Sequence, residues 1–534
     1  MPDSRDYQLP GRSPVYAANG MAATAHPEAT ATAIETLKAG GNAFDAAIAA
    51  AGVLAVVEPG MSGIGGDCFA LLSTGGETNM AYNGTGTAGR SMTADRLLEL
   101  GVDTIRPDSP HSVTTPGAVD AWQAILDTYG TRDFGELLAP AIKFAEQGYI
   151  VQPRVAFEWQ LGLERIKRHP SARSLFLNHG QPLVAGDVHR QPKLAKALRA
   201  IASRGADGFY KGPVAQDIVA SLRAAGGLQA LEDFAAVGGS WVDPVASDYR
   251  GFEVMQCPPN GQGFMVSIML NILTHFSVDE LKPDSAENLH LQIEVSRLAY
   301  ADRNRFFDDY YATERAPEAL TELLSAEHAR AHARRIHPER AMDPEADQQA
   351  IRGGDTTYIA VADRDGNAIS LMNSLYHPFG SGLASEQYGI LLHNRGSAFA
   401  VSGPAPRVIE PGKRPVHTIL PAMLAKHGRP TLIFGVVGAE FQSGGQVRVV
   451  SGVVDAGLDV QQALDLPRVF YGDDAVLIER GLSDPVRQQL ESLGHRMKAA
   501  CGPLGAGQAI WIDHERGCLI GGTDHRKDGC AIGY

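Results

Sequence analysis

Two runs of β-branched and apolar residues in the last third of the chain flank a short polar segment. The runs cover residues 357–362 and 368–375, and Asp-Arg-Asp-Gly-Asn (363–367) separates them. Runs of this kind predict strands, and the polar residues between them are typical of a tight turn. The pattern therefore predicts a β-hairpin, preceded by the flexible sequence Gly-Gly-Asp (353–355).

The N-terminal part of the chain has the periodicity of a helix pair. Residues 27–37 combine helix-opening residues with alanine-rich periodicity, which Gly40-Gly41 ends. Asn42 is a suitable N-cap for a second helix over 43–57. We expect this helix to pack through one face of small and apolar residues, formed by Ala47, Ala50, Ala51 and Leu54.

A glycine-rich loop follows the second helix. It covers residues 58–67 and leads into an apolar run over 68–73 that predicts a strand. Glycine clusters can also bind the phosphates of a dinucleotide, but they then lie between a strand and the helix that follows it. Here the order is helix, loop and strand, which does not favour a nucleotide site.

The middle of the chain is mostly helical. Amphipathic periodicity runs from about residue 120 to 231, with clear examples at 140–147 and 191–203. A strand beginning near Phe252 ends at Cys-Pro-Pro-Asn-Gly-Gln-Gly (257–263), which opens a helix through Leu273. The Pro-Pro-Asn-Gly sequence suits either a plain turn or a backbone-contact loop near a site.

Composition is that of an ordinary globular protein. The 534 residues are 44% hydrophobic, and the net charge of -14 comes without a Lys/Arg-rich run, so nucleic acid is not an expected partner. The N-terminus lacks the apolar core of a signal peptide. The longest apolar run, 43–57, carries Asp45 and is too short to span a bilayer. Five scattered cysteines without metal spacing are expected to be reduced thiols: Cys68, Cys257, Cys501, Cys518 and Cys530. These features predict a cytoplasmic protein without a membrane span.

One pair of histidines has the spacing of metal ligands. His328 and His332 are four residues apart, which places both on one face of a helix. No third ligand is evident in the sequence, and neighbouring arginines such as Arg330 and Arg334 oppose a cation. We therefore expect a solvated helix face and no metal.

Thr356 is the candidate nucleophile. It opens the first strand of the predicted hairpin directly after a glycine pair and Asp355, where a chain can be cut and a new terminus exposed. An N-terminal threonine carries a hydroxyl nucleophile and an α-amine of pKa about 8, which accepts the hydroxyl proton at neutral pH. A bare Thr-Thr pair is more often part of an ordinary hairpin, so the assignment depends on the wider pattern.

The wider pattern resembles the γ-glutamyltransferase (γ-glutamyltranspeptidase) family of self-cleaving N-terminal-nucleophile hydrolases. At the hairpin the match is Thr-Thr (356–357) followed by Val-x-Asp-x-Asp-Gly-Asn-Ala (361–368). The Ser-Gly-Ile-Gly-Gly loop (62–66) and the chain end (521–534) also match. The resemblance covers nearly the whole chain.

This resemblance implies a fold and a maturation step. The fold is of the α+β class, a four-layer αββα sandwich in which helices cover two packed antiparallel sheets. In maturation, the Thr356 hydroxyl attacks the Asp355 carbonyl, an N-to-O shift gives an ester, and water opens it. The resulting large chain (1–355) and small chain (356–534) of one precursor remain one folded unit. The resemblance implies neither a cofactor nor a metal.

The resemblance also gives candidate roles to individual residues. Ser374 stands where the family has a Thr that hydrogen-bonds the nucleophile, and a Ser hydroxyl can do the same. Arg90 stands where the family holds a substrate carboxylate, and we predict that it is an anion clamp, although an Arg after small residues is by itself usually a solvated surface residue. Gly438 and Ala439 match the Gly-Gly pair whose backbone N–H groups form the oxyanion hole. Ala439 can serve there if its φ stays negative.

Five positions depart from the family pattern. Tyr376, Arg395 and Ala398 stand where the family binds the α-amino group of a γ-glutamyl substrate with an Asn, a Gln or Glu, and an Asp. Arg395 would repel that ammonium group and attract an anionic or carbonyl group. His417 and Thr418 replace a serine pair, and His417 is either a satisfied loop histidine or a substrate contact.

Three hypotheses for function follow. The first is an amidohydrolase that cleaves a small-molecule amide with an anionic acyl group of the oxamate or glutaryl type, as in the family's oxamate amidohydrolase and cephalosporin-acylase-like branch. The second is a true γ-glutamyl hydrolase or transpeptidase acting on glutathione, with its amine site rebuilt from other residues. The third is a non-catalytic scaffold, which the intact Thr356 opposes. The sequence leaves open whether water or an amine is the acceptor, and whether the protein forms a homo-oligomer.

Overall fold

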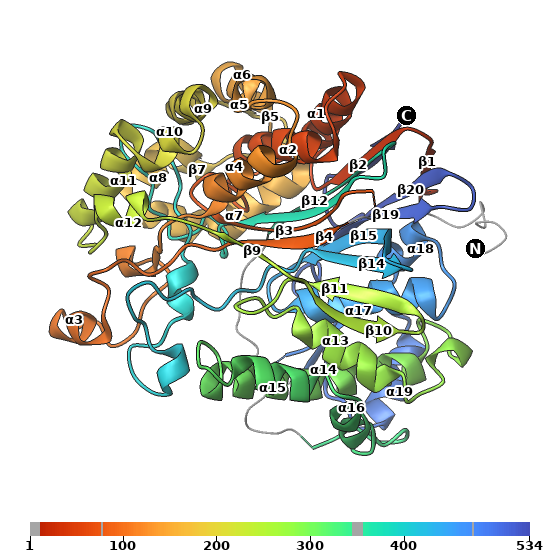
Figure 1. The fold of residues 1–534 in the computed structure, drawn as a ribbon. Coiled ribbons are helices and arrows are strands. Elements are labelled where there is room, and N and C mark those ends of the chain that lie inside the picture. Colours follow the sequence, from red (N-terminus) through yellow and green to blue (C-terminus); the bar gives the residue numbers. More distant parts are fainter. Residues whose placement is uncertain (1–10, 76–77, 344–355, 473–474) are drawn as a thin grey trace.

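Four layers make up the computed structural model, which describes residues 11–75, 78–343, 356–472 and 475–534 (Figure 1). Two seven-stranded sheets pack face to face, and helices cover the outer side of each sheet. Every neighbouring pair of strands in these two sheets is antiparallel. The predicted αββα sandwich of the α+β class is confirmed.

Each large sheet combines strands from both ends of the chain. The first contains, in spatial order, β1 (Val15–Ala17), β20 (Cys518–Thr523), β19 (Ala506–Asp513), β15 (Arg429–Val437), β14 (Ala422–Lys426), β11 (Phe252–Gln256) and β10 (Val245–Tyr249). The second contains β21 (Cys530–Gly533), β2 (Gly20–Thr24), β12 (Thr357–Asp363), β13 (Ala368–Ser374), β3 (Asp67–Ser73), β4 (Asn79–Gly84) and β9 (Ser240–Val242). A cut before Thr356 would leave both fragments with strands in both sheets.

Among the residues that the structure describes, three small sheets lie outside the sandwich. They pair β5 (Tyr149–Ile150) with β8 (Val188–His189), β6 (Leu177–Asn178) with β7 (Gln181–Pro182), and β16 (Val469–Tyr471) with β17 (Val476–Ile478) and β18 (Met497–Ala499).

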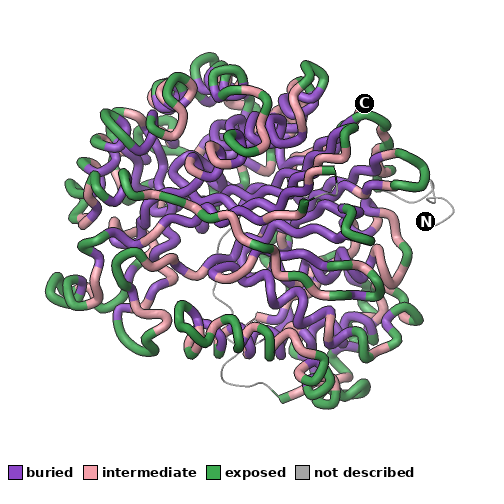
Figure 2. Tube along the Cα trace, in the orientation of Figure 1, coloured by how far each residue is buried: buried purple, intermediate pink, exposed green. Residues whose placement is uncertain are grey.

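The predicted hairpin is confirmed as β12 and β13, which lie between β2 and β3 in the second sheet. All residues of both strands are buried, as the continuous purple of the central strands in Figure 2 illustrates. In β12, Ile359 and Val361 face the helices, whereas Tyr358 and Ala360 face the other sheet. A strand covered on both faces needs apolar residues at successive positions, which explains the unbroken apolar run in the sequence.

The helices form one layer on each side. On the side of the second sheet, packed either on it or on one another, are α1 (Pro27–Lys38), α2 (Ala43–Val57), α4 (Ala118–Tyr129), α5 (Phe134–Leu137), α6 (Ala139–Gln147), α7 (Pro153–Arg168), α8 (Pro170–Phe176), α9 (Pro192–Arg204), α10 (Asp207–Tyr210), α11 (Pro213–Ala224) and α12 (Leu231–Ala235). Those that pack on the first sheet are α13 (Phe264–Leu273), α14 (Ala286–Asp309), α15 (Ala316–Leu323), α16 (Ala326–Ala333), α17 (Phe441–Val454) and α18 (Val460–Asp465). Smaller clusters hold α3 (Ala94–Glu99) and α19 (Asp484–Ser492).

The predicted helix pair is present as α1 and α2, but one expectation about α2 is wrong. The Asn42 side chain accepts the N–H groups of Phe44 and Asp45, and the Asp45 carboxylate accepts the N–H of Asn42, so the cap is reciprocal. Instead of packing through one face, α2 is buried at all fifteen positions. It lies between the sheet and other helices, where Gly52 leaves no room for a side chain beside Leu138. Across the described ranges, none of the helices combines the length and apolarity needed to cross a membrane.

Candidate active site

The hairpin brings Thr356 and Ser374 together. Thr356 immediately precedes β12, Ser374 ends β13, and both side chains are buried. The Thr356 hydroxyl donates a hydrogen bond to Ser374 Oγ at 2.9 Å. Ser374 Oγ also accepts the backbone N–H of Tyr376 at 3.0 Å. Asp355, on the other side of the expected cleavage site, lies outside the described residues.

The glycine-rich loop lies directly against this hairpin end. The Asn373 side chain donates to the carbonyl of Gly63 at 3.0 Å. A Cβ on Gly66 would lie 2.5 Å from the carbonyl oxygen of Ser374, so only glycine fits at this close approach. Asp67, the first residue of β3, stands opposite Ser374 in the sheet. The loop therefore supports the Ser374 backbone.

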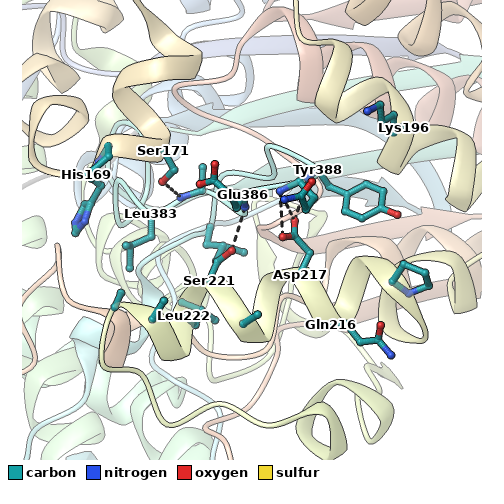
Figure 3. Close-up of a pocket in the computed structure, with 18 residues that line it drawn as sticks. His169, Ser171, Lys196, Gln216, Asp217, Ser221, Leu222, Leu383, Glu386 and Tyr388 are labelled. Carbon is teal, nitrogen blue, oxygen red and sulfur yellow. Dashed lines mark hydrogen bonds between the residues drawn. The ribbon is translucent and has the colours of Figure 1, made fainter.

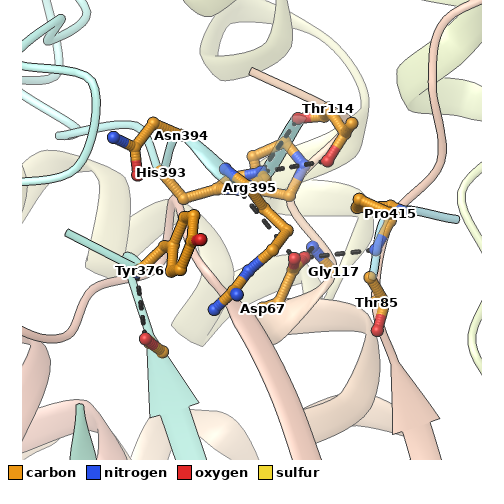
Figure 4. A network of polar contacts seen from close by, with 12 residues as sticks. Asp67, Thr85, Thr114, Gly117, Tyr376, His393, Asn394, Arg395 and Pro415 are labelled. Atoms are coloured by element: carbon orange, nitrogen blue, oxygen red, sulfur yellow. Dashed lines mark hydrogen bonds and ion pairs between the residues drawn. The ribbon is translucent and has the colours of Figure 1, made fainter. Parts of the chain in front are cut away.

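Asp67 is the buried anion behind the site (Figure 4). Its Oδ1 accepts the backbone N–H groups of Gly86 and Gly117, each at 3.1 Å, and its Oδ2 lies 3.3 Å from His417 Nε2. Burial acts to raise the pKa of Asp67. His393, His417 and the N–H of Gly86 have the opposite effect, and together they outweigh burial and lower the pKa to about 2. Asp67 is therefore ionised at neutral pH and positions three segments of the chain.

His417 is fully buried, and the protein satisfies its polar groups. Its Nε2 faces Asp67, its Nδ1 lies 3.4 Å from the N–H of Ile419, and its ring packs edge-on against Phe69 at 4.9 Å. Burial and the neighbouring cation Arg395 lower its pKa to about 3, so the ring is neutral at pH 7. Of the two alternatives, these contacts favour a satisfied loop histidine over a substrate contact.

The Pro-Pro-Asn-Gly turn contributes to the same region through Asn260. The carbonyl of Asn260 accepts the backbone N–H of His417 at 2.8 Å. Its side chain donates to Thr85 Oγ1 at 3.3 Å and accepts from Asn83 at 2.9 Å. Asn260 thus joins the β4 end to the His417 segment, which supports the interpretation of this turn as a loop near the site.

Arg395 is a buried cation with unused hydrogen-bond donors. Its side chain is 1% exposed, its guanidinium carbon lies 3.7 Å from the centroid of the Tyr376 ring, and its Nη1 donates to Thr418 Oγ1 at 3.2 Å. Within the part of the chain that the structure describes, Nε and Nη2 have no acceptor. Burial lowers the pKa of Arg395 to about 10, and Tyr376, Asp67 and Glu440 oppose that effect. The group is therefore charged at neutral pH and able to bind an anion or a carbonyl oxygen.

A continuous series of contacts connects the nucleophile to this cation. Thr356 contacts Ser374, Ser374 contacts Tyr376, and Tyr376 stacks on Arg395, which donates to Thr418. Tyr376 has φ +77°, a conformation that costs a non-glycine residue about 1–3 kcal/mol. Strain of this kind is retained where a side chain must be held in one place.

The turn between β15 and α17 has the geometry of an anion-binding turn. Within the described ranges, the backbone N–H groups of Gly438 and Ala439 have no hydrogen-bond acceptor, and both lie at the N-terminus of α17. The expectation of a negative φ for Ala439 is wrong, since its φ is +51°. The strand turns sharply into the helix there, and an alanine tolerates this conformation at a cost of about 1–2 kcal/mol. Glu440, the next residue, is buried in an ion pair with Arg303.

Arg90 differs from the other predicted site residues. Its side chain is exposed, and its backbone N–H donates to Asp233 Oδ1 at 2.9 Å. Across the described residues its guanidinium makes no hydrogen bond or ion pair. The structure thus shows a solvated arginine, and its role as an anion clamp stays a prediction.

A groove of about 980 Å³ lies between α8, α11 and the segment 383–392, and none of the predicted site residues lines it (Figure 3). Asp217 on α11 accepts the backbone N–H groups of Gln387 and Tyr388, and Ser221 accepts that of Glu386. These bonds hold the segment 383–392 against α11, so the polar side chains that line the groove already have a structural role.

Comparison with known proteins agrees with this geometry. The sequence profile of the gamma-glutamyltranspeptidase family matches residues 29–534. The chain belongs to this family. It is 36% identical to the glutathione hydrolase-like YwrD proenzyme of Bacillus subtilis, over 96% of this chain and 98% of that protein. It is 29% identical to the oxamate amidohydrolase proenzyme of Klebsiella pneumoniae, over 97% and 98% of the two chains.

The fold comparison agrees with the family assignment. The crystal structure of cephalosporin acylase from Bacillus halodurans superimposes with a TM-score of 0.91 at 37% identity, covering 100% of this chain and 99% of that one. Members of this family are N-terminal-nucleophile hydrolases and transferases, so the chain is an enzyme of the amidohydrolase type.

Sequence reasoning did not identify Asp67 or His393 as parts of the site. His393 is fully buried between the backbone of Thr114, to which its Nε2 donates at 3.0 Å, and the N–H of Arg395, which its Nδ1 accepts at 3.1 Å. The sequence signals for these two residues were weak: Asp67 opens an otherwise apolar strand, and His393 ends an apolar run.

Proposed function

We propose that the chain cleaves itself between Asp355 and Thr356 and then hydrolyses the amide bond of a small molecule with an anionic acyl group. After cleavage, the new α-amine of Thr356 accepts the proton of its own hydroxyl, which attacks the substrate carbonyl. Ser374 orients that hydroxyl through the 2.9 Å hydrogen bond. Water then releases the acyl group from the threonine ester.

The oxyanion of each tetrahedral intermediate needs donors that are in place before reaction. The N–H groups of Gly438 and Ala439 supply two such donors at the start of α17, where the helix dipole adds to the stabilisation. Removing one such donor typically costs about 3–4 kcal/mol of transition-state stabilisation. Because the donors belong to the backbone, the alanine at 439 preserves the function.

The observation that carries the choice of substrate is the buried guanidinium of Arg395. By resemblance to the family, it occupies a position that contacts the α-ammonium of a γ-glutamyl substrate. Two like charges about 4 Å apart repel by roughly 4 kcal/mol in a partly buried site. A terminal carboxylate or a second carbonyl on the acyl group would instead accept from Nε and Nη2, which have no acceptor within the described ranges. Oxamate-type and glutaryl-type amides have this chemistry.

The names of the relatives fit two candidate substrates. An oxamate amidohydrolase is among the similar proteins, and oxamate has an anionic acyl group without an α-amine. A cephalosporin acylase is also among them, which supports amide hydrolysis. A glutathione hydrolase-like protein is also among them, which supports the alternative of a γ-glutamyl hydrolase or transpeptidase. Arg395 and Tyr376 favour the first candidate because the guanidinium has no acceptor and the tyrosine hydroxyl carries no charge, so neither can pair with an ammonium as a carboxylate does.

The decisive experiment has two stages. Intact mass and N-terminal sequencing of the purified protein should show a small chain beginning Thr-Thr-Tyr-Ile, and Thr356→Ala should remain uncut. The processed protein is then given oxamate, glutaryl anilide and γ-glutamyl anilide in parallel. Preferred hydrolysis of the first two supports the proposal, whereas preferred hydrolysis of γ-glutamyl anilide establishes the alternative. An uncut and inactive wild-type chain would instead favour the scaffold hypothesis.

A further inference from the structure

Two groups of metal-ligating side chains lie outside the active site, and each includes at least one residue of helix α14. One consists of His290 and Glu294 with His495, and the other of Asp302 with His328 and His332. In each group the candidate ligand atoms all lie within 4.8 Å of one another. The hydrogen bonds and ion pairs around each group show whether its ligand atoms are available.

The first group is already satisfied by the protein. His290 Nε2 donates to the carbonyl of His337 at 2.8 Å, and His290 Nδ1 lies 2.7 Å from His495 Nε2. The Glu294 carboxylate accepts from Arg297 Nη1 at 3.0 Å and from the N–H of Met342 at 2.8 Å. Since Arg297 already neutralises the carboxylate, this group is a structural hydrogen-bond network.

The second group consists of ligand atoms that converge on one point. His328 and His332 lie one turn apart on α16, and their Nε2 atoms are 2.7 Å and 2.9 Å from the same oxygen of Asp302, Oδ2. The side chains of Asp302, His328 and His332 are only 11%, 20% and 10% exposed. Across the described residues these two histidines are the only side chains that bond to Asp302, so no arginine neutralises its carboxylate.

We propose that Asp302, His328 and His332 form a binding site for one divalent transition-metal ion, with Zn²⁺ as its best-suited occupant. Two imidazoles and one carboxylate are a common zinc ligand set, and partial exposure allows water to complete a tetrahedron. With bonds of about 2.0–2.2 Å, neighbouring ligand atoms of such a site are about 3.4 Å apart. The observed distances therefore need to open by roughly half an ångström, which side-chain rotation provides.

The ligand chemistry selects among cations. Imidazole nitrogen suits zinc, copper and nickel, whereas magnesium and calcium require oxygen ligands. The arginines that the sequence places nearby are not an obstacle, because Arg330, Arg334 and Arg335 are exposed and solvent screens their charge. The third ligand that the sequence does not reveal is Asp302, which precedes His328 by 26 positions and comes from a different helix.

The bound ion would cross-link α14 to α16. Asp302 is followed by Arg303, whose guanidinium pairs with Glu440 beside the oxyanion turn, so α14 also supports the active site. Zinc is therefore expected to stabilise the folded protein without entering the reaction. A ligand that binds only the folded state raises the melting temperature in proportion to the logarithm of its excess over Kd.

The test uses the full-length protein, stripped with a chelator and dialysed. Titration calorimetry with Zn²⁺ should give one equivalent bound, and thermal melting should move to higher temperature with Zn²⁺ but not with Mg²⁺. Asp302→Asn, which keeps the side-chain size, and His332→Ala should each weaken binding by about tenfold or more. His275→Gln, which changes an exposed histidine, is the matched control and should bind as the wild type does.

Three results would overturn the proposal. They are the absence of saturable Zn²⁺ binding by the wild type, unchanged binding by Asp302→Asn, and loss of binding in His495→Ala alone, which would place the ion in the first group. The self-processing rate and the circular dichroism of each variant show whether it has folded. If His332→Ala fails to fold, Asp302→Asn and the X-ray absorption spectrum of the zinc-loaded wild type, which should show two imidazole ligands, decide the question.

Discussion

The guanidinium carbon of Arg395 lies 3.7 Å from the centroid of the Tyr376 ring, and both side chains are buried. Stacking of this kind is worth about 2 kcal/mol when the cation is desolvated, and it holds the guanidinium in one plane. The N–H of Tyr376 is bonded to Ser374 Oγ, which also accepts from Thr356. The proposed specificity element and the nucleophile are therefore positioned by the same segment.

Substitution of Arg395 should change substrate choice more than it changes self-processing. In Arg395→Gln, an anionic acyl group loses charge-assisted hydrogen bonds worth about 1.5–3 kcal/mol, so kcat/KM for glutaryl anilide should fall by roughly 10- to 150-fold. Arg395→Lys should also lose activity, because an ammonium lacks the planar fork. The rates are compared with those for γ-glutamyl anilide. Equal losses on both substrates would contradict a role in acyl-group recognition.

Ser374 should act through the orientation of the Thr356 hydroxyl. Ser374→Ala removes the hydrogen bond to that hydroxyl, and self-cleavage should slow by about 10- to 100-fold because the nucleophile loses its fixed direction. Ser374→Thr keeps a hydroxyl at this position, so this variant should cleave itself at nearly the wild-type rate. The appearance of the small chain, followed over time by intact mass, measures both. A slow Ser374→Thr variant would mean that packing at this position matters more than the hydroxyl.

The oxyanion turn offers a matched pair of substitutions. Gly438 has φ +121°, and a Cβ on this residue would lie 2.6 Å from Gly505 Cα. Gly438→Ala should therefore displace the turn and reduce activity by at least about tenfold. Ala439→Gly relieves a left-handed alanine and should retain activity within about twofold. Steady-state kinetics of the two processed variants provide the comparison. If Ala439→Gly is the more damaged variant, the Ala439 methyl group has a contact role of its own.

Local features were predictable from the sequence, whereas contacts between distant segments were not. The hairpin and the Asn42 cap depend on residues a few positions apart, and both were identified. The contact between Asp67 and His417 joins residues 350 positions apart, and that between Asp302 and His328 joins two helices. A residue's own neighbours in sequence carry no signal for such pairs. The error about α2 has the same origin, because burial on all sides is decided by what packs around the helix.

Buried neutral histidines should make the protein less stable in mild acid. Burial lowers the pKa of His26 and His417 to about 3 and that of His189 to about 4, from an ordinary value of 6.5. Below pH 6.5 the unfolded chain binds protons that the folded protein excludes, so the free energy of unfolding decreases. The stabilisation is complete above pH 6.5 and is lost as the pH falls towards 4 and 3, at about 1.4 kcal/mol per pH unit for each histidine.

His189 allows this effect to be isolated. Its ring packs edge-to-face with that of Trp159, with 5.3 Å between the ring centroids, and within the described ranges its Nε2 has no hydrogen-bond partner. His189→Phe therefore keeps an aromatic ring at this position and removes the titration. The decrease in melting temperature between pH 7.5 and pH 5.5 should be smaller in this variant than in the wild type, by the equivalent of about 1 kcal/mol. His275→Gln, at an exposed position, should leave the decrease unchanged. An identical decrease in His189→Phe and the wild type would mean that the His189 ring is already protonated or reached by water in the folded protein.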